Sequence, residues 1–279
     1  MNYFNTKLHG VLLLTTFFLS WAIKDVFIKI NLFQVDPLAV TFVISVSALL
    51  SALFMRFIRS RASIRRPLLQ VPPNNRLLPF GLALFTATAI TSSIYAISLI
   101  GPVAYTITDG IIYSLSVLFL STLLLEEKTQ KSTIIGLFIA TAGGICFYWG
   151  DINIKLMAKI GGGILAAISS LSYAFSLVFI KKLLRQNVST NDILIIRFSL
   201  LGVISVIGLL LTKPSIDPIP LIYLILIGSI GYTGLLTILF EGLRNVPANL
   251  LSVFVASSPL FSSAMTWLLI PNTTYSVWQ

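Results

Sequence analysis

Of the ionisable side chains that lie inside long apolar stretches, five are the best suited to chemistry there: Lys24, Asp25, Asp109, Arg197 and Glu241. In such surroundings, charged groups can bind a polar molecule or carry a proton. A charge at the centre of a membrane span costs about 2.5–3.5 kcal/mol on insertion scales, so each is a candidate for function. Few residues of the types used in catalysis are present. With one histidine and one cysteine, the interior can form no zinc cluster, Ser-His-Asp triad or Cys-His pair.

The acids differ in their local surroundings. Asp25 and Lys29 are four residues apart, so on a helix they would face one another as a local ion pair or lie in a substrate pathway. Asp109 is seven residues into its apolar stretch, about 10 Å deep at 1.5 Å per residue. No cation lies within four residues of it, while Thr106, Thr108 and Tyr113 offer hydroxyl groups. Asp109 is either a structural carboxylate bonded to these hydroxyls or a site that binds a proton or a substrate amine.

Two further features have both a structural and a functional interpretation. Glu241 and Arg244 lie at the end of one apolar stretch and Arg197 near the start of another, which predicts a Glu-Arg cluster or an inner gate at one membrane face. Pro259 removes a hydrogen bond in the middle of a helix. The resulting kink either serves packing alone or frees a carbonyl for a polar ligand.

Four aromatic residues are candidates for the wall of a central cavity: Trp21, Tyr95, Tyr113 and Tyr173. Plain packing, or a belt at the membrane interface, is the alternative. Three consecutive glycines at positions 161–163 have no P-loop lysine after them, so no nucleotide site is expected.

The elements that must position these groups follow from the composition. Hydrophobic residues make up 56% of the 279 residues and charged residues 10%, with a mean hydropathy of +0.95. A soluble domain carries about 25% charged residues, so an ordinary soluble enzyme and a disordered chain are excluded. The net charge of +10 does not predict a nucleic-acid partner, because basic residues in membrane proteins gather in cytoplasmic loops.

Continuous apolar stretches predict an all-α polytopic membrane protein. A span needs roughly 20 apolar residues, and a β-barrel would show alternation instead. Nine stretches are predicted to be spans: Leu8–Ile30, Pro37–Ile58, Leu77–Leu99, Pro102–Leu125, Ser132–Gly150, Ile160–Lys182, Asp192–Thr212, Ile219–Leu243 and Pro247–Ile270. Thirteen Lys and Arg residues then fall on the side of the N-terminus and five on the other, which places the N-terminus in the cytoplasm.

An internal repeat divides the chain into residues 1–150 and 151–279. The segment 21–29 matches 173–181, with an aromatic residue, Ala, Val-Phe-Ile and Lys in the same order. Pro102 similarly matches Pro247. Because each full repeat has five helices, an odd number, the second copy enters the membrane from the opposite face. Inverted repeats of this kind are typical of secondary transporters, whose substrate site lies between the repeats.

With these features the chain resembles the drug/metabolite transporter superfamily, in its EamA-type branch. The matching features are the aromatic-Ala segments ending in Lys, the Glu126-Glu127 turn, the Gly136 and Gly143 pair, Arg197 and Pro259. The resemblance implies ten helices in two inverted repeats, and export or uptake of amino acids and other small metabolites.

The sequence departs from that pattern at a few places. The segment near Ile44 is apolar where the second repeat has Arg197, Ser114 stands opposite Pro259, and Asn272 stands opposite Glu127. The sequence also ends where a tenth helix would begin, which predicts a shortened protein or a fragment with only four helices in the second repeat.

The predicted function is secondary transport, without enzymatic activity. We expect export of a small metabolite such as an amino acid by alternating access, without a cofactor or metal, in a bacterial inner membrane. The partners expected are the small-molecule substrate and the lipid bilayer, with no nucleic acid. The alternatives are a truncated remnant that does not transport and a membrane-embedded enzyme.

Overall fold

The computed structural model describes residues 3–32, 35–60, 77–148 and 156–269. Some side chains within these segments are not described, among them those of Asp25, Lys29 and Pro102. The predicted Asp25–Lys29 ion pair therefore lies outside the described residues, as do the segment 270–279 and Asn272 within it.

Every regular element in the described part of the chain is helical, which confirms the all-α prediction. In chain order the elements are α1 (Tyr3–Leu32), α2 (Pro37–Ser60), α3 (Leu77–Leu125), α4 (Lys131–Tyr148), α5 (Leu156–Arg185), α6 (Thr190–Thr212), α7 (Pro218–Leu226), the π-helix η2 (Ile227–Gly234), α8 (Leu235–Asn245) and α9 (Ala248–Leu269). These bounds follow the predicted spans closely, because each apolar stretch satisfies its own backbone hydrogen bonds by forming a helix.

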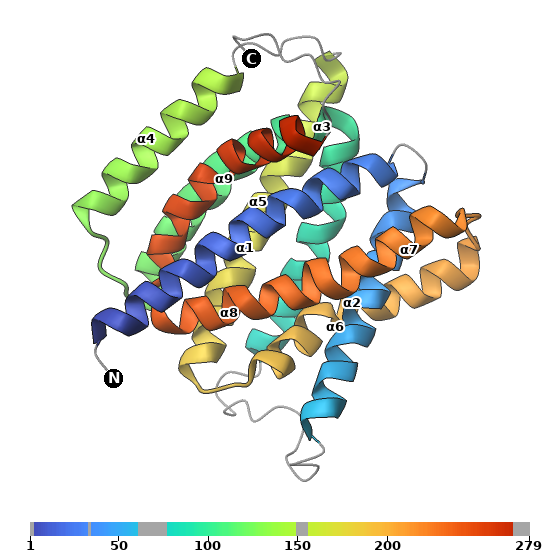
Figure 1. Ribbon diagram of the computed structural model, residues 1–279, viewed down its shortest axis with the longest axis horizontal. Helices are drawn as coiled ribbons and strands as arrows, with labels where there is room; N and C mark the ends of the chain where they lie inside the picture. Colours follow the sequence, from blue (N-terminus) through green and yellow to red (C-terminus); the bar gives the residue numbers. More distant parts are fainter. Residues whose placement is uncertain (1–2, 33–34, 61–76, 149–155, 270–279) are drawn as a thin grey trace.

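Two of the predicted spans meet without a loop. The stretches Leu77–Leu99 and Pro102–Leu125 form the two arms of α3, which turn sharply at Gly101 (Figure 1). Gly101 has φ 78° and ψ 164°, a conformation that a residue with a Cβ rarely adopts. The two halves of α3 can therefore cross the membrane in opposite directions with almost no connecting segment.

Another predicted span, Ile219–Leu243, is made of three consecutive elements. The helices α7 and α8 are joined end to end by η2, whose sequence contains Gly228, Gly231 and Gly234. At Gly228 the backbone approaches α2 so closely that a Cβ would lie 2.5 Å from the carbonyl oxygen of Ile44. Wider π-helical turns occur often at functional sites, and this one lies in the middle of a span.

Helices from the two halves of the chain pack against each other. The arms of α3 lie along α5 and α9, α2 lies along α6 and η2, and α1 lies beside α8 and α9 (Figure 1). The helix α4 lies at the edge, against α9 and α3. Because each half packs mainly on the other, the interior is shared between them.

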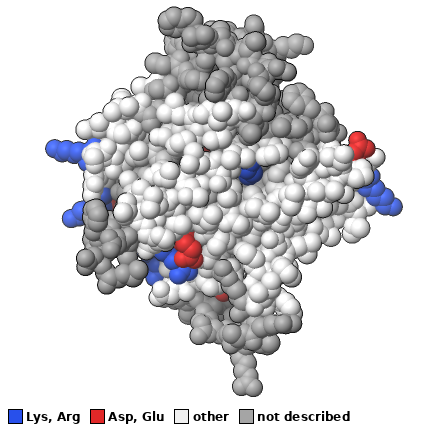
Figure 2. Space-filling view, in the orientation of Figure 1, with Lys and Arg blue, Asp and Glu red and all other residues white. Residues whose placement is uncertain are grey.

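The outer surface is suited to lipid. Large apolar side chains such as Phe54, Phe119, Phe138 and Leu211 are exposed on the helices. Most charged side chains lie toward opposite ends of the molecule, with a broad uncharged surface between them (Figure 2). Six described helices or arms of helices are long and apolar enough to cross a membrane, and the stretches Leu8–Lys24 and Ala248–Phe261 are shorter apolar helices.

Candidate functional site

A cavity lies inside the bundle, and seven elements contribute to its wall: α1, α3, α5, α6, η2, α8 and α9. The volume open to the centres of water molecules is about 70 Å³. One water needs roughly 10–15 Å³ on this measure, so the cavity has room for a few waters. Its polar and aromatic lining consists of Phe17, Phe18, Trp21, Lys24, Ser93, Tyr105, Thr106, Asp109, Tyr113, Tyr173, Arg197, Tyr232 and Ser258.

Lys24 of α1 lies buried against two aromatic rings. Its Nζ is 3.3 Å from the centroid of the Trp21 ring and 4.5 Å from that of Tyr232. The two rings themselves meet edge to face, with centroids 5.4 Å apart. An ammonium group held over aromatic faces is attracted by the ring quadrupole, by about 2 kcal/mol or more when water is excluded. Trp21 and Lys24 were predicted from the sequence as site residues, whereas Tyr232 was not.

Arg197 of α6 forms another part of the wall. Its side chain is 4% exposed, and its guanidinium carbon lies 5.8 Å from the centroid of the Tyr173 ring. Tyr173 in turn lies near Tyr113, with ring centroids 6.2 Å apart. Within the described part of the chain, the Nε atom of Arg197 is buried without a hydrogen-bond partner.

Asp109 of α3 is tied to the other half of the chain. The Oγ of Ser170 in α5 donates to its Oδ1 at 2.7 Å. The hydroxyl of Thr108 turns to the carbonyl oxygen of Ala104, at 2.9 Å, rather than to Asp109. Thr108 is therefore not the hydroxyl partner of Asp109 that the sequence suggested. A threonine in a helix readily donates to the carbonyl oxygen four residues before it.

Three predicted site residues lie outside the cavity wall. Tyr95 is half-buried on α3 and Glu241 lies at the end of α8. Pro259 is buried against α3, where a Cβ at Gly110 would meet its Cγ at 3.3 Å. Its neighbour Ser258 is the residue of α9 that reaches the lining.

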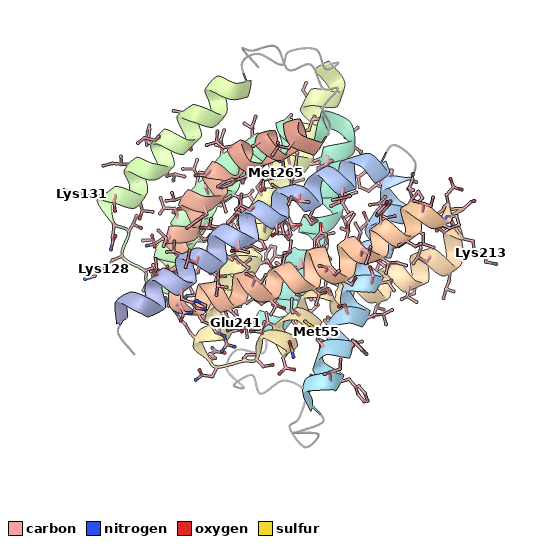
Figure 3. All side chains as sticks on the ribbon, in the orientation of Figure 1. Met55, Lys128, Lys131, Lys213, Glu241 and Met265 are labelled. Atoms are coloured by element: carbon pink, nitrogen blue, oxygen red, sulfur yellow. The ribbon has the colours of Figure 1, made fainter. Side chains whose placement is uncertain are left out.

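The predicted cluster of Glu241, Arg244 and Arg197 needs a correction. Glu241 accepts a hydrogen bond from Thr190 at 2.7 Å and lies 3.7 Å from Arg244. Arg197 is seven residues beyond Thr190 along α6, about 10 Å deeper at 1.5 Å per residue. That distance places Arg197 in the cavity wall and leaves Glu241 at one end of the bundle, opposite the end that carries Lys213 (Figure 3).

A second polar network joins four helices at the same end as Glu241. Lys181 of α5 donates to the carbonyl oxygens of Leu243, in the last turn of α8, and of Val246, the residue after that helix. One turn on, Arg185 bonds to Glu127 at 2.7 Å and to the carbonyl oxygen of Leu125 at the end of α3. These basic groups satisfy carbonyls that helix ends leave without partners.

The acid of this network also holds the start of α9. Glu127 accepts from the backbone N–H of Asn249 at 3.1 Å, and the Asn249 amide donates to the carbonyl oxygen of Lys128 at 3.0 Å. At the neighbouring ends of α2 and α6, Arg56 and Asp192 form an ion pair at 2.6 Å. Lys128 and Lys131 lie at the left edge of the view, where α4 begins (Figure 3). Together these contacts close the bundle at this end.

Two functional candidates were missed by the sequence analysis, and their signals differ in strength. Ser170 is three residues before Tyr173, so it shares a helix face with a residue already identified, and this spacing could have found it. Tyr232 lies among the glycines of η2, and nothing in the local sequence distinguishes it from a packing residue. Among the described residues, no cluster of three or more His, Cys, Asp and Glu could hold a metal ion.

The fold and the cavity define a class: a helical, multi-pass integral membrane protein with a cavity lined by residues of both halves of the chain. The model of the EamA-like transporter family matches the chain twice, over residues 8–149 and 160–278. The chain belongs to this family, whose members are membrane transporters of small molecules.

Comparison with other proteins adds the fold alone. A solved structure entitled "Crystal structure of protein" is similar to this chain with a TM-score of 0.73 at 16% identity. The likeness covers 96% of this chain and 91% of that one. No curated protein matches the sequence.

Proposed function

We propose that the protein is a secondary transporter that moves a small metabolite, such as an amino acid, by alternating access to the central cavity. One observation carries this proposal: residues of both family matches line one cavity inside the bundle, and several of them are charged or aromatic. Trp21, Lys24 and Asp109 come from the first match, and Tyr173 and Arg197 from the second. Substrate sites between two repeats near the middle of the membrane are typical of secondary transporters.

The proposed mechanism needs the two ends of the bundle to open in turn. The end that carries Lys181, Glu127 and Arg185 is closed by hydrogen bonds between helix ends, which suits a gate that breaks and re-forms. The backbone turns at Gly101, and η2 packs closely against α2 at Gly228. Kinks and close contacts of this kind can absorb small rotations. Asp109 and Lys24 are the groups through which a proton or a substrate could be coupled to this change.

We further propose export from the cytoplasm of a bacterium, with the N-terminus inside. The basic residues Arg56, Lys128, Arg185 and Arg244 share the end closed by the hydrogen-bond network, whereas Lys213 lies at the opposite end. Basic residues are more frequent on the cytoplasmic side of membrane proteins. That distribution supports assigning the closed end to the cytoplasm.

Transport by the purified protein tests the proposal. The protein is reconstituted into liposomes, and the uptake of radiolabelled amino acids and monocarboxylates is measured with and without a pH gradient. We expect saturable uptake of at least one compound above that of empty liposomes. A Trp21→Ala variant should lose it, because Trp21 forms part of the wall. If no compound is taken up faster than by empty liposomes, the transport proposal fails.

A further inference from the structure

We infer that Arg197 binds a carboxylate of the transported molecule, so that the substrate is a small organic acid with an apolar body. This inference rests on the proposed function, since it assigns the ligand of the same cavity. Its basis is the buried guanidinium of Arg197, which lines the cavity and whose Nε–H has no hydrogen-bond partner among the described residues.

Arg197 forms no ion pair with another residue in the described part of the chain. The ion pairs found there join other groups: Arg56 with Asp192, Arg185 with Glu127, and Arg244 with Glu241. A charge buried without a partner is expensive, and an unmade hydrogen bond to a charged group adds to that cost. A ligand that supplies a negative charge and two acceptor oxygens would remove both costs when it binds.

The guanidinium favours a carboxylate over other acceptors. Its planar fork of N–H donors matches the two oxygens of a carboxylate in a bidentate pair. Tyr173, whose ring lies beside the guanidinium, limits the directions from which a ligand can approach. The limited space in the cavity also suits a planar carboxylate better than a tetrahedral phosphate group with its larger hydration shell.

The rest of the lining fits an apolar body. Leu177, Leu236, Leu251 and Val255 contribute aliphatic surface, and the aromatic rings of Trp21 and Tyr113 add flat walls. Two basic side chains, Lys24 and Arg197, and one acidic side chain, Asp109, line the cavity. The electrostatic potential there therefore favours a negatively charged ligand over a positively charged one. An α-amino group can be accommodated at Asp109, but the inference requires only the carboxylate.

The carboxylate assignment is tested by measuring ligand binding to the purified protein in detergent, which does not require transport. The probes are 3-phenylpropanoate and L-phenylalanine, each compared with its neutral-headed amide, together with 4-methylpentanoate, 4-methylpentanamide and inorganic phosphate. Calorimetry gives the affinities. We expect at least one carboxylate to bind about tenfold or more tightly than its amide, as charge-assisted hydrogen bonds are about twice as strong as neutral ones.

Variants then assign the effect to Arg197. Arg197→Met should remove the preference for the carboxylate while leaving the amide affinity within about twofold, and Arg197→Lys should restore only part of it because the fork is lost. Lys131→Met is the matched control, since Lys131 is exposed at the start of α4, away from the cavity. The thermal unfolding midpoint of each variant shows whether it is folded.

The outcomes separate this inference from the transport proposal. Three results would overturn the carboxylate assignment: equal affinities for the acids and their amides, tighter binding of inorganic phosphate than of any carboxylate, or no binding of any carboxylate at about 1 mM. A preference for carboxylates that survives in Arg197→Met would overturn the role of Arg197. If the preference is found but liposomes take up nothing, the carboxylate site stands and the transport proposal fails.

Discussion

Ser170 Oγ donates a hydrogen bond to Asp109 Oδ1 at 2.7 Å and so joins two helices from opposite halves of the chain. The same hydroxyl also reaches the carbonyl oxygen of Ala166 at 2.8 Å, which fixes its position on α5. A carboxylate that lines the cavity is thus held by a group of the other half. Any relative movement of the halves must change the surroundings of Asp109.

The first prediction is that Asp109→Asn abolishes transport or its dependence on pH while the protein still folds. The substitution keeps the shape and the bond from Ser170 but removes the negative charge. Initial uptake rates between about pH 5 and 8 give the measurement. Asp217→Asn is the control, because Asp217 is exposed before α7 and makes no side-chain cap. Wild-type rates across this range for Asp109→Asn would show that the carboxylate is only structural.

The second prediction concerns Lys181, whose ammonium group donates to two carbonyl oxygens at the C-terminal end of α8. Lys181→Met should lower the free energy of unfolding by about 1–3 kcal/mol, because buried acceptors lose their donor. The thermal unfolding midpoint in detergent reports this loss. Lys182→Met, a change of the next residue, should have an effect close to zero, and a comparable loss in both variants would contradict the capping role.

The third prediction distinguishes two adjacent acids. Glu127 is buried and accepts from both Arg185 and the backbone N–H of Asn249, whereas Glu126 is exposed. Glu127→Gln should destabilise the protein by about 1–2 kcal/mol, since a charged acceptor becomes a neutral one. It should also increase the labelling of a cysteine placed at Asn249. Glu126→Gln should change neither the stability nor the labelling. Equal effects of the two substitutions would contradict the role of Glu127 in holding Arg185 and the start of α9 together.

The fourth prediction concerns the close approach of η2 to α2. A Cβ at Gly228 would overlap with Ser47 Oγ, so Gly228→Ala should force the helices apart at a cost of about 1–3 kcal/mol. Gly163→Ala is the matched control, since nothing lies within 4 Å of its Cβ position on α5. Alanine there should be neutral or stabilising by up to about 1 kcal/mol. A Gly228→Ala protein with an unchanged unfolding midpoint would contradict this packing.

The fifth prediction tests orientation in the membrane. On a background without Cys146, a cysteine at Lys213 should react with an impermeant maleimide added to intact cells, and one at Lys128 only after the cells are opened. Both side chains are exposed at opposite ends of the bundle (Figure 3). The reverse pattern would place the N-terminus outside and the closed end away from the cytoplasm.

The sequence by itself determined the helices and the class of protein. Each apolar stretch is long enough to span the bilayer, and the backbone has few ways other than a helix to satisfy its polar groups there. The break between the predicted spans Leu77–Leu99 and Pro102–Leu125 falls at Gly101, where α3 turns with a positive φ. These features are local, so neighbouring residues alone were sufficient to predict them.

Only the tertiary structure decided which polar residues meet. The sequence grouped Arg197 with Glu241, but their different depths along α6 and α8 put one in the cavity and the other at the end of the bundle. The partner of Asp109 and the role of Tyr232 were likewise hidden. In a membrane helix both the lipid-facing and the buried faces are apolar, so hydrophobic periodicity does not reveal which side points inward. That choice is made by close packing between distant segments, such as α3 against α5 and α2 against η2.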